Sequence, residues 1–205
     1  MRHIYLERIK RLQAIAQAGL TYTPNPFDRE RFEELATLSH QLMADLVGLS
    51  QARIEDFYLE EKGYPTPKVD VRGVVLQDDR FLMVREVFDG CWSLPGGWAD
   101  VGLSPAENVV KEILEETGFE AEPVRFLGVL DHSLHPHPLT PCHIYRLFIE
   151  CRLTGGSART SVESTAVDFF SLDQLPPLSV NRITEPQLQR LYQQLQQVHA
   201  PAFFE

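Results

Sequence analysis

Apolar residues recur at helical spacing over residues 1–62 and predict three helices. The first is expected over residues 2–18, with Gly19 ending it. The second follows the break at Asn25-Pro26, and the third begins at Ser50 as its N-cap. The predicted apolar stripes consist of Tyr5, Ile9, Leu12, Ile15, Phe32, Leu35, Leu38, Leu42, Leu46, Ile54, Phe57 and Tyr58. Residues 1–62 are therefore expected to form a small all-helical domain whose stripes are buried against another surface.

The period changes after residues 63–67, a predicted linker in which Pro65 and Pro67 exclude helix. Residues 68–205 are expected to form a second domain in which strands dominate. We expect strands at 69–76, 81–84, 124–130, 144–153 and 167–170, a turn at 77–80, and helices at 105–117 and 188–198. Mixed strands and helices in this order predict a layered domain of the α/β or α+β class.

The helix at 105–117 has strong boundary signals. Ser104-Pro105-Ala106-Glu107 is a capping box with proline at the first helical position, and Gly118 provides a left-handed stop. The helix also has an apolar stripe that predicts firm docking. Its acidic face is therefore expected to be held in a fixed position.

That acidic face contains Glu112, Glu115 and Glu116. Like charges at this spacing destabilise a helix by about 0.2–0.5 kcal/mol per pair. A bound Mg²⁺ removes this cost, because it takes oxygen ligands and bridges carboxylates to substrate phosphates. A solvated acidic face is the alternative. The glycine pair Gly96-Gly97, where backbone can approach a ligand, favours the metal site.

This segment resembles the Nudix box, here residues 97–119. The box reads Gly, five residues, Glu, seven residues, Arg-Glu, an aliphatic, any residue, Glu-Glu, any residue, Gly, an aliphatic. Two positions depart from it, Leu103 for the first Glu and Lys111 for the Arg. Because both members of an interacting pair are replaced, no buried charge is left unpaired, and Leu103 is expected to pack on the Lys111 stem. The matching positions are Gly97, Glu112, Ile113, Glu115, Glu116 and Gly118, with Phe119 as an apolar substitute.

The flanking motifs at 66–72, 92–105, 135–138 and 178–182 are similar to those of bacterial Nudix hydrolases with an extra N-terminal domain. That group includes CDP-choline pyrophosphatase. The resemblance covers essentially the whole chain. It implies a Nudix α/β/α sandwich with a mixed sheet behind the helical domain.

The resemblance also implies a divalent cofactor, Mg²⁺ or Mn²⁺. Glu112 and Glu116 are the expected metal ligands, and Glu115 is a third ligand or holds metal-bound water. The Gly96 carbonyl is a further candidate ligand. For the general base, Glu163 in a flexible loop and Glu115 are both candidates. By sequence alone Glu163 equally fits an exposed loop carboxylate, and the resemblance favours a base or an additional metal ligand.

Four residues are candidates for substrate binding. Arg72 is placed to reach a phosphate or to pair with an acid such as Glu86. Trp98 beside the glycine pair is suited to stacking on a base, although packing explains it equally well. His132 and His137 lie in a proline-stiffened loop and are candidates to donate hydrogen bonds to a substrate phosphate. The alternative is that they are solvated loop histidines.

These residues predict hydrolysis of a nucleoside diphosphate linked to another group, X. CDP-choline, giving CMP and phosphocholine, is the first expected substrate, and ADP-ribose is the alternative. The departures at Leu103 and Lys111 leave open a function of another class, a non-catalytic module that senses a nucleotide.

The remaining features concern location and partners. A net charge of −10 disfavours a general nucleic-acid or anionic-membrane surface. We find no apolar run that fits a signal peptide or membrane span. Three scattered cysteines make no disulfide framework, so a cytoplasmic enzyme is expected. The amphipathic N-terminal helices are expected to form a homodimer.

Overall fold

The computed structural model describes residues 3–59, 61–197 and 199–205. The chain divides into two compact units. The helical unit consists of Met1–Lys68 and Ser133–His143, and the sheet unit of Val69–His132 and Ile144–Glu205. The loop from Ser133 to His143 thus groups with the N-terminal helices.

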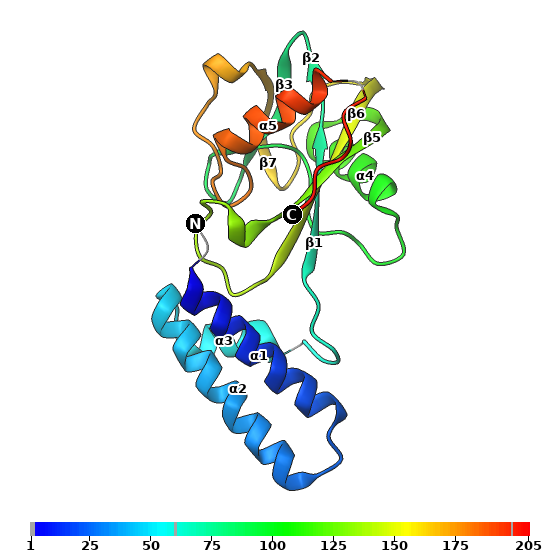
Figure 1. Cartoon of the computed structure of the whole chain (residues 1–205). Coiled ribbons are helices and arrows are strands. Elements are labelled where there is room, and N and C mark those ends of the chain that lie inside the picture. Colours follow the sequence, from blue (N-terminus) through cyan, green and yellow to red (C-terminus); the bar gives the residue numbers. More distant parts are fainter. Residues whose placement is uncertain (1–2, 60, 198) are drawn as a thin grey trace. The chain divides into compact units, whose positions relative to one another are not determined.

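The helical unit contains α1 (Ile4–Tyr22), α2 (Pro26–Val47) and α3 (Gln51–Leu59). Figure 1 shows α1 and α2 side by side as a hairpin. Asn25 caps α2, because its side-chain oxygen accepts a hydrogen bond from the Phe27 amide at 2.9 Å, and Pro26 follows at the first helical position. Ser50 caps α3 through the amide of Arg53, as expected. The core of the unit consists of Leu6, Ile9, Met43, Ala44 and Ile54.

One prediction for these helices was wrong. Gly19 does not end α1, which continues to Tyr22. A Cβ at Gly19 would lie 2.5 Å from the Phe32 ring, so this glycine permits close helix packing instead of a stop.

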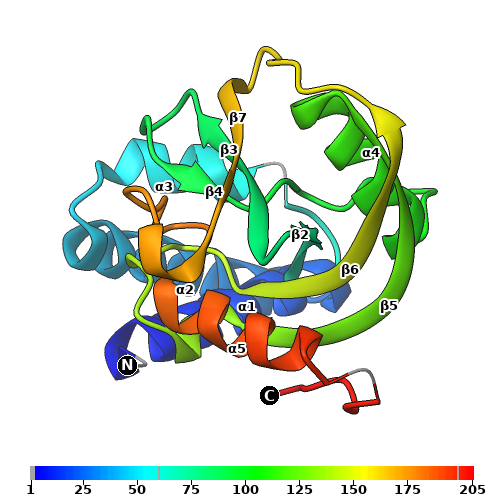
Figure 2. The ribbon, with the colours of Figure 1, turned by 90° about the horizontal axis from the view of Figure 1, so that it is seen from above.

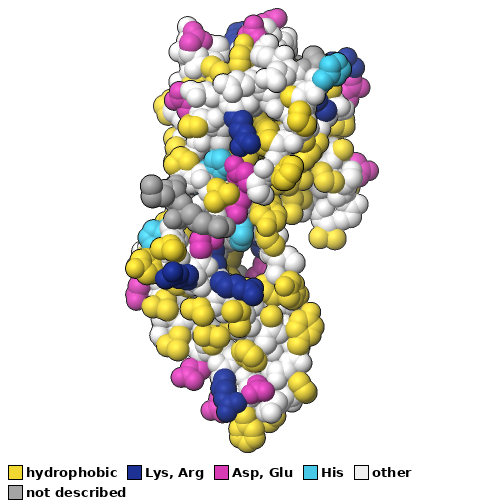
Figure 3. All heavy atoms as spheres, in the orientation of Figure 1, with side chains coloured by type: hydrophobic (Ala, Val, Ile, Leu, Met, Phe, Trp, Pro, Cys, Tyr) yellow, Lys and Arg dark blue, Asp and Glu magenta, His cyan; other side chains and the backbone are white. Residues whose placement is uncertain are grey.

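The predicted stripes are only partly buried within the unit: Ile9 and Ile54 lie in its core, whereas about half of the stripe residues are exposed. Ser39 Oγ donates to the amide oxygen of Gln13 at 2.8 Å between α1 and α2, so small and polar side chains share the buried face. Apolar residues remain exposed over the helical unit, as Figure 3 shows for one face. They include Tyr5, Leu12, Ile15, Leu38 and Leu42.

The sheet unit contains two sheets. One has the strand order β1 (Lys68–Val74), β6 (Ile144–Gly156), β5 (Phe119–Asp131). The other has the order β2 (Leu76–Gln77), β3 (Arg80–Glu86), β4 (Trp92–Ser93), with β7 (Ser164–Phe170) also paired to β3. Figure 2 shows β5 and β6 as a long curved pair, and they are antiparallel.

Alternating side chains of β3 enter two different cores. Phe81 and Met83 pack in the core that includes α5 (Glu185–Leu195), whereas Leu82 packs in the core that includes α4 (Pro105–Thr117). The sheets therefore have helix-covered cores on both sides, which confirms the α/β class with N-terminal helices before a sheet domain. Short 3₁₀ turns lie at His132–Leu134 and Leu172–Gln174.

Local sequence signals placed most elements of this unit. The turn at 77–80 is confirmed, with positive φ at Asp78 and Asp79 joining β2 to β3. The two-residue strand β4 was missed, and β5 begins earlier than expected, at Phe119. The final helix runs from Glu185 to Leu195 instead of 188–198, and Val198 lies outside the described residues. None of the helices in the described part of the chain has the length and apolar character that crossing a membrane requires.

Candidate metal centre

Helix α4 presents the acidic residues in a fixed orientation. Ser104 Oγ and the Glu107 carboxylate form the reciprocal capping box, and Gly118 adopts φ 75° at the C-terminal end. Val109, Ile113 and Thr117 are buried on the docked side. The predicted helix boundaries are confirmed.

The backbone before α4 is fixed by β1. The Gly73 amide donates to the Pro95 carbonyl and the Val71 amide donates to the Gly97 carbonyl, each at 2.8 Å. Gly96 has φ 142°, and a Cβ there would lie 2.0 Å from the Val71 carbonyl oxygen. A Cβ on Gly97 would lie 3.3 Å from the carboxylate atoms of Glu112. The glycine pair thus lets the chain run between a strand and an acidic side chain.

Glu116 is the most buried of the three carboxylates. It is 5% exposed, and its Oε2 accepts a hydrogen bond from the Gly96 amide at 2.8 Å. Burial raises its pKa to about 7, although Arg72 and the Gly96 bond oppose the shift. Burial also raises the pKa of the half-buried Glu112. The positive charges of Lys111 and Arg72 lower this pKa, whereas the negative charges of Glu115 and Glu163 raise it further.

Glu115 has a different environment. It is exposed and accepts a hydrogen bond from Lys111 Nζ at 2.8 Å. The same ammonium lies 3.3 Å from Asp100. Lys111 therefore links the loop after the glycine pair to α4, at the position where the family pattern has arginine.

Asn108 provides a second link, which sequence reasoning missed. It is 1% exposed, accepts from the Asp100 amide at 2.8 Å and donates to the Leu103 carbonyl at 3.2 Å. The sequence feature that could have revealed this link is Asn108 itself, a polar residue beside the apolar residues on the docked face of α4. Asn108 and Lys111 together brace the loop without the usual Glu–Arg pair.

Glu163 lies in a loop that is bonded to the end of α4. The Arg159 amide donates to the Thr117 carbonyl at 2.8 Å, and Ser164 Oγ donates to the Glu116 carbonyl at 2.7 Å. The Glu163 side chain is exposed, and its charge is one of the lesser influences that raise the pKa of Glu112. The loop that carries Glu163 is therefore fixed at the C-terminal end of α4, the helix with the acidic face.

The donor set fits a hard divalent cation. Two carboxylates removed from solvent, with raised pKa values, lie against the glycine pair, and a cation there would offset their desolvation. As they stand, no three His, Cys, Asp or Glu side chains among the described residues converge on one point. Glu115 in particular is turned to Lys111, so metal binding requires side-chain rotation.

Arg72 lies behind this centre rather than open to solvent. It is 3% exposed, donates to both Asp70 oxygens at 2.7 and 3.0 Å, and donates to the Leu94 carbonyl at 3.1 Å. Pairing with an acid, one of the two expectations for Arg72, is confirmed, but the acid is Asp70 instead of Glu86, which pairs with Arg182 at 2.9 Å. Arg72 instead supports the backbone just before the glycine pair.

A second buried arginine, Arg146, completes this network. It lies 3.3 Å from Asp70 and donates to the backbone carbonyls of Asn181 and Arg182. The motif at 178–182 is thereby fixed to β6. Sequence reasoning noted the motif but missed Arg146, which had no local signal.

The other substrate candidates are dispersed. Trp98 is 53% exposed, and its backbone forms an isolated antiparallel β-bridge with Asp70. His132, the last residue of the Val69–His132 stretch of the sheet unit, is buried at the start of a 3₁₀ turn. His137 belongs to the helical unit.

Comparisons with known proteins match both parts of the chain. Residues 66–191 match the family model described as the NUDIX domain, and residues 4–58 match one described as a UDP-X-like, N-terminal oligomerisation domain. A putative ADP-ribose pyrophosphatase of Bacillus subtilis is 52% identical over 92% of this chain and 90% of its own length.

Two solved structures are also similar. A UDP-X diphosphatase is 35% identical, with a TM-score of 0.65 and full coverage of both chains. An ADP-ribose pyrophosphatase of Streptococcus suis is 41% identical, with a TM-score of 0.63, over 68% of this chain and all of the other.

Proposed function

We propose that this chain, which belongs to the Nudix family of hydrolases, uses the Glu112–Glu116 face of α4 to hydrolyse nucleoside diphosphates linked to a second group. The observation that supports the site is the position of Glu116. It is buried, bonded to the Gly96 amide, and on the same helix face as Glu112. A structural role alone does not require a desolvated carboxylate at this point.

Glu112, Glu116 and the Gly96 carbonyl would hold Mg²⁺ or Mn²⁺. The bound ion supplies charge neutralisation of the diphosphate and a lowered pKa of water. The Gly96 amide orients one Glu116 oxygen, and Lys111 keeps the loop after the glycine pair attached to α4. Arg72 supports the same backbone from the opposite side through Leu94.

Glu163 is the proposed general base. Its loop is bonded to the C-terminal end of α4, and its side chain is exposed near Glu112. Glu115 is the weaker candidate, because its carboxylate is already engaged by Lys111. A base needs an accessible lone pair within reach of the water that it deprotonates.

ADP-ribose is the substrate that we place first, since the Bacillus subtilis relative and the Streptococcus suis structure both bear that name. UDP-linked compounds follow, on the name of the full-length structural relative. CDP-choline, the first expectation from the flanking motifs, stays a prediction. The complete metal-binding carboxylate set favours catalysis over the sensor function.

A homodimer and a cytoplasmic location are also proposed. Exposed Tyr5, Leu12 and Ile15 on α1, with Leu38 and Leu42 on α2, provide an apolar surface for a second copy. The cysteines at 91, 142 and 151 are free, as a reducing compartment requires.

The test is turnover of ADP-ribose, UDP-glucose and CDP-choline by the full chain with Mg²⁺, Mn²⁺ or EDTA, with products separated by chromatography. We expect metal-dependent AMP and ribose 5-phosphate. Glu112→Gln should remove activity by orders of magnitude, whereas the matched control Glu120→Gln on β5 should not. Equal activity of the two variants would remove Glu112 from the site.

A further inference from the structure

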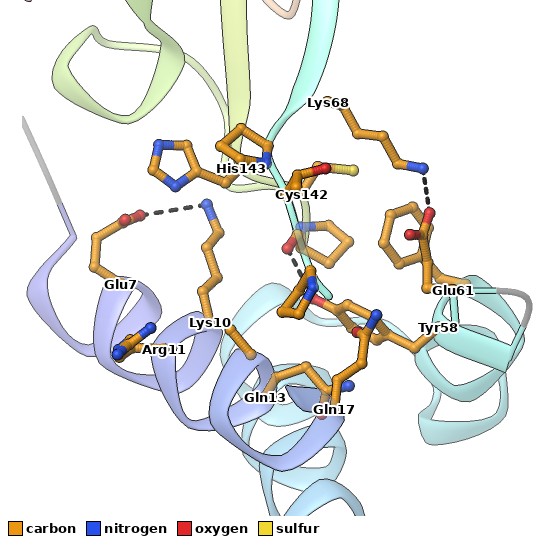
Figure 4. A pocket seen from close by; sticks show the side chains of 16 residues that line it. Glu7, Lys10, Arg11, Gln13, Gln17, Tyr58, Glu61, Lys68, Cys142 and His143 are labelled. Atoms are coloured by element: carbon orange, nitrogen blue, oxygen red, sulfur yellow. Dashed lines mark hydrogen bonds and ion pairs between the residues drawn. The ribbon is translucent and has the colours of Figure 1, made fainter. Parts of the chain in front are cut away.

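The helical unit contains a partly open cavity of about 400 Å³, shown in Figure 4. Its walls come from α1, α3, Glu61 and the segments 65–68 and 141–143, all within that unit. None of its residues belongs to the metal centre described above. Cavities of about 300–1,000 Å³ are typical of small-molecule sites, so this volume is sufficient for a metabolite.

The inner wall is polar although it is buried. Gln13 and Gln17 of α1 are 6% and 8% exposed. Gln13 accepts from Ser39 through its amide oxygen, and Gln17 donates to the Gly63 carbonyl at 3.2 Å. These bonds fix both amide groups and leave the Gln13 N–H donors and the Gln17 oxygen for a ligand. Burying such groups is costly without partners, so their presence on a cavity wall favours a polar occupant.

Cations outnumber anions around the cavity. Lys10 lies 3.3 Å from Glu7, and its side chain is only 10% exposed. Lys68 forms an ion pair with Glu61, and its side chain is more exposed than that of Lys10. Each ammonium group has three N–H donors. The carboxylate that it pairs with fixes its position and leaves further N–H donors for a ligand. Arg11 adds a further positive charge to the lining.

The two ends of the cavity differ. In Figure 4 the Lys10 ammonium lies close to His143, whereas Lys68 is at the other end beside Glu61. Burial raises the pKa of the Cys142 thiol. Burial also raises the pKa of the Tyr58 hydroxyl, and nearby groups add smaller effects in the same direction. Both side chains are therefore neutral at pH 7 and do not repel an anion. The apolar part of the lining includes Phe57, Pro65, Pro67 and Pro141.

We propose that this cavity binds a small phosphorylated organic molecule. Its phosphate contacts Lys10 and His143, and its body lies on the proline and aromatic surface with hydroxyl groups toward Gln13 and Gln17. Lysine binds phosphate well as a compact point charge. A bare anion would leave the apolar surface and the two amides unused, so an organic phosphate fits better than inorganic phosphate.

Cys142 provides a local probe. The full-length protein in EDTA is alkylated with iodoacetamide in the presence of ribose 5-phosphate, inorganic phosphate, ribose or succinate, and modification is followed by peptide mass spectrometry. Ribose 5-phosphate should protect Cys142 saturably and more strongly than inorganic phosphate, while Cys91 in the sheet unit is modified at an unchanged rate. No saturable protection, or equal protection by ribose or succinate, overturns the proposal.

Variants test the contacts. Lys10→Gln should weaken protection about tenfold or more, because a charge-assisted hydrogen bond is lost. Lys62→Gln is the matched control outside the lining. Ala14→Leu fills the cavity without changing charge and should abolish protection even if Lys10→Gln does not fold, with circular dichroism confirming the helices. Unchanged protection in folded Ala14→Leu refutes the site. Turnover at the metal centre is a separate measurement, so this outcome does not depend on the proposed hydrolase.

Discussion

Replacing Glu116 by glutamine should stabilise the metal-free protein while destroying the proposed metal site. Burial raises the pKa of Glu116 from 4.5 to about 7 in the folded protein. The folded state therefore binds a proton more tightly than the unfolded state. Between pH 4.5 and about 7 the unfolded chain loses this proton first, so folding stability falls as pH rises through that window.

The magnitude follows from the shift. One pKa unit corresponds to about 1.4 kcal/mol, so Glu116 should cost about 3 kcal/mol of folding free energy above pH 7. Glutamine is nearly isosteric with a protonated Glu116 and still accepts from Gly96. The two proteins should be equally stable below pH 4.5, and Glu116→Gln should be more stable at pH 8.

The assay is urea unfolding in EDTA at several pH values, comparing wild type, Glu116→Gln and Glu115→Gln as the exposed control. Every other titrating group is shared, so the difference between the curves reports Glu116 together with its coupling to Glu86 and Glu112. Adding Mg²⁺ at pH 8 should stabilise the wild type but not Glu116→Gln, because a ligand raises the free energy of unfolding only when the folded protein binds it. Parallel pH profiles for wild type and Glu116→Gln would refute the reasoning.

The remaining predictions concern the supports of the same centre. Gly96→Ala should destabilise the sheet unit by more than about 3 kcal/mol, because the added Cβ would lie 2.0 Å from the Val71 carbonyl oxygen. Thermal unfolding measures this loss. The control is Gly102→Ala, which should be milder because its Cβ would have no neighbouring atom within 4 Å. Glu163→Gln should lower kcat about 10²–10⁴-fold with little change in KM, and a change confined to KM would assign it to binding. Asn108→Ala should cost about 1–3 kcal/mol by leaving the Asp100 amide unpaired, as urea unfolding measures, and a loss under 0.5 kcal/mol would contradict its role as loop anchor.

Local chemistry explains how much of the fold was predictable. The capping box at Ser104, the left-handed Gly118 and the aspartates of the β2–β3 turn act over a few residues, and each element appears where expected. The errors lie in α1 and α2, where apolar residues occupy more than one face. Periodicity then cannot identify the packed face, which depends on the helix partner.

The sequence by itself determined the capped acidic helix, the glycine pair before it and the family to which they belong, because these depend on residue spacing within one segment. Only the tertiary structure decided that Glu116 is desolvated whereas Glu115 pairs with Lys111. It also decided that Arg72 pairs with Asp70, to which Arg146 comes from 76 positions away. Burial and long-range ion pairs arise when segments pack together, and no local pattern encodes that environment.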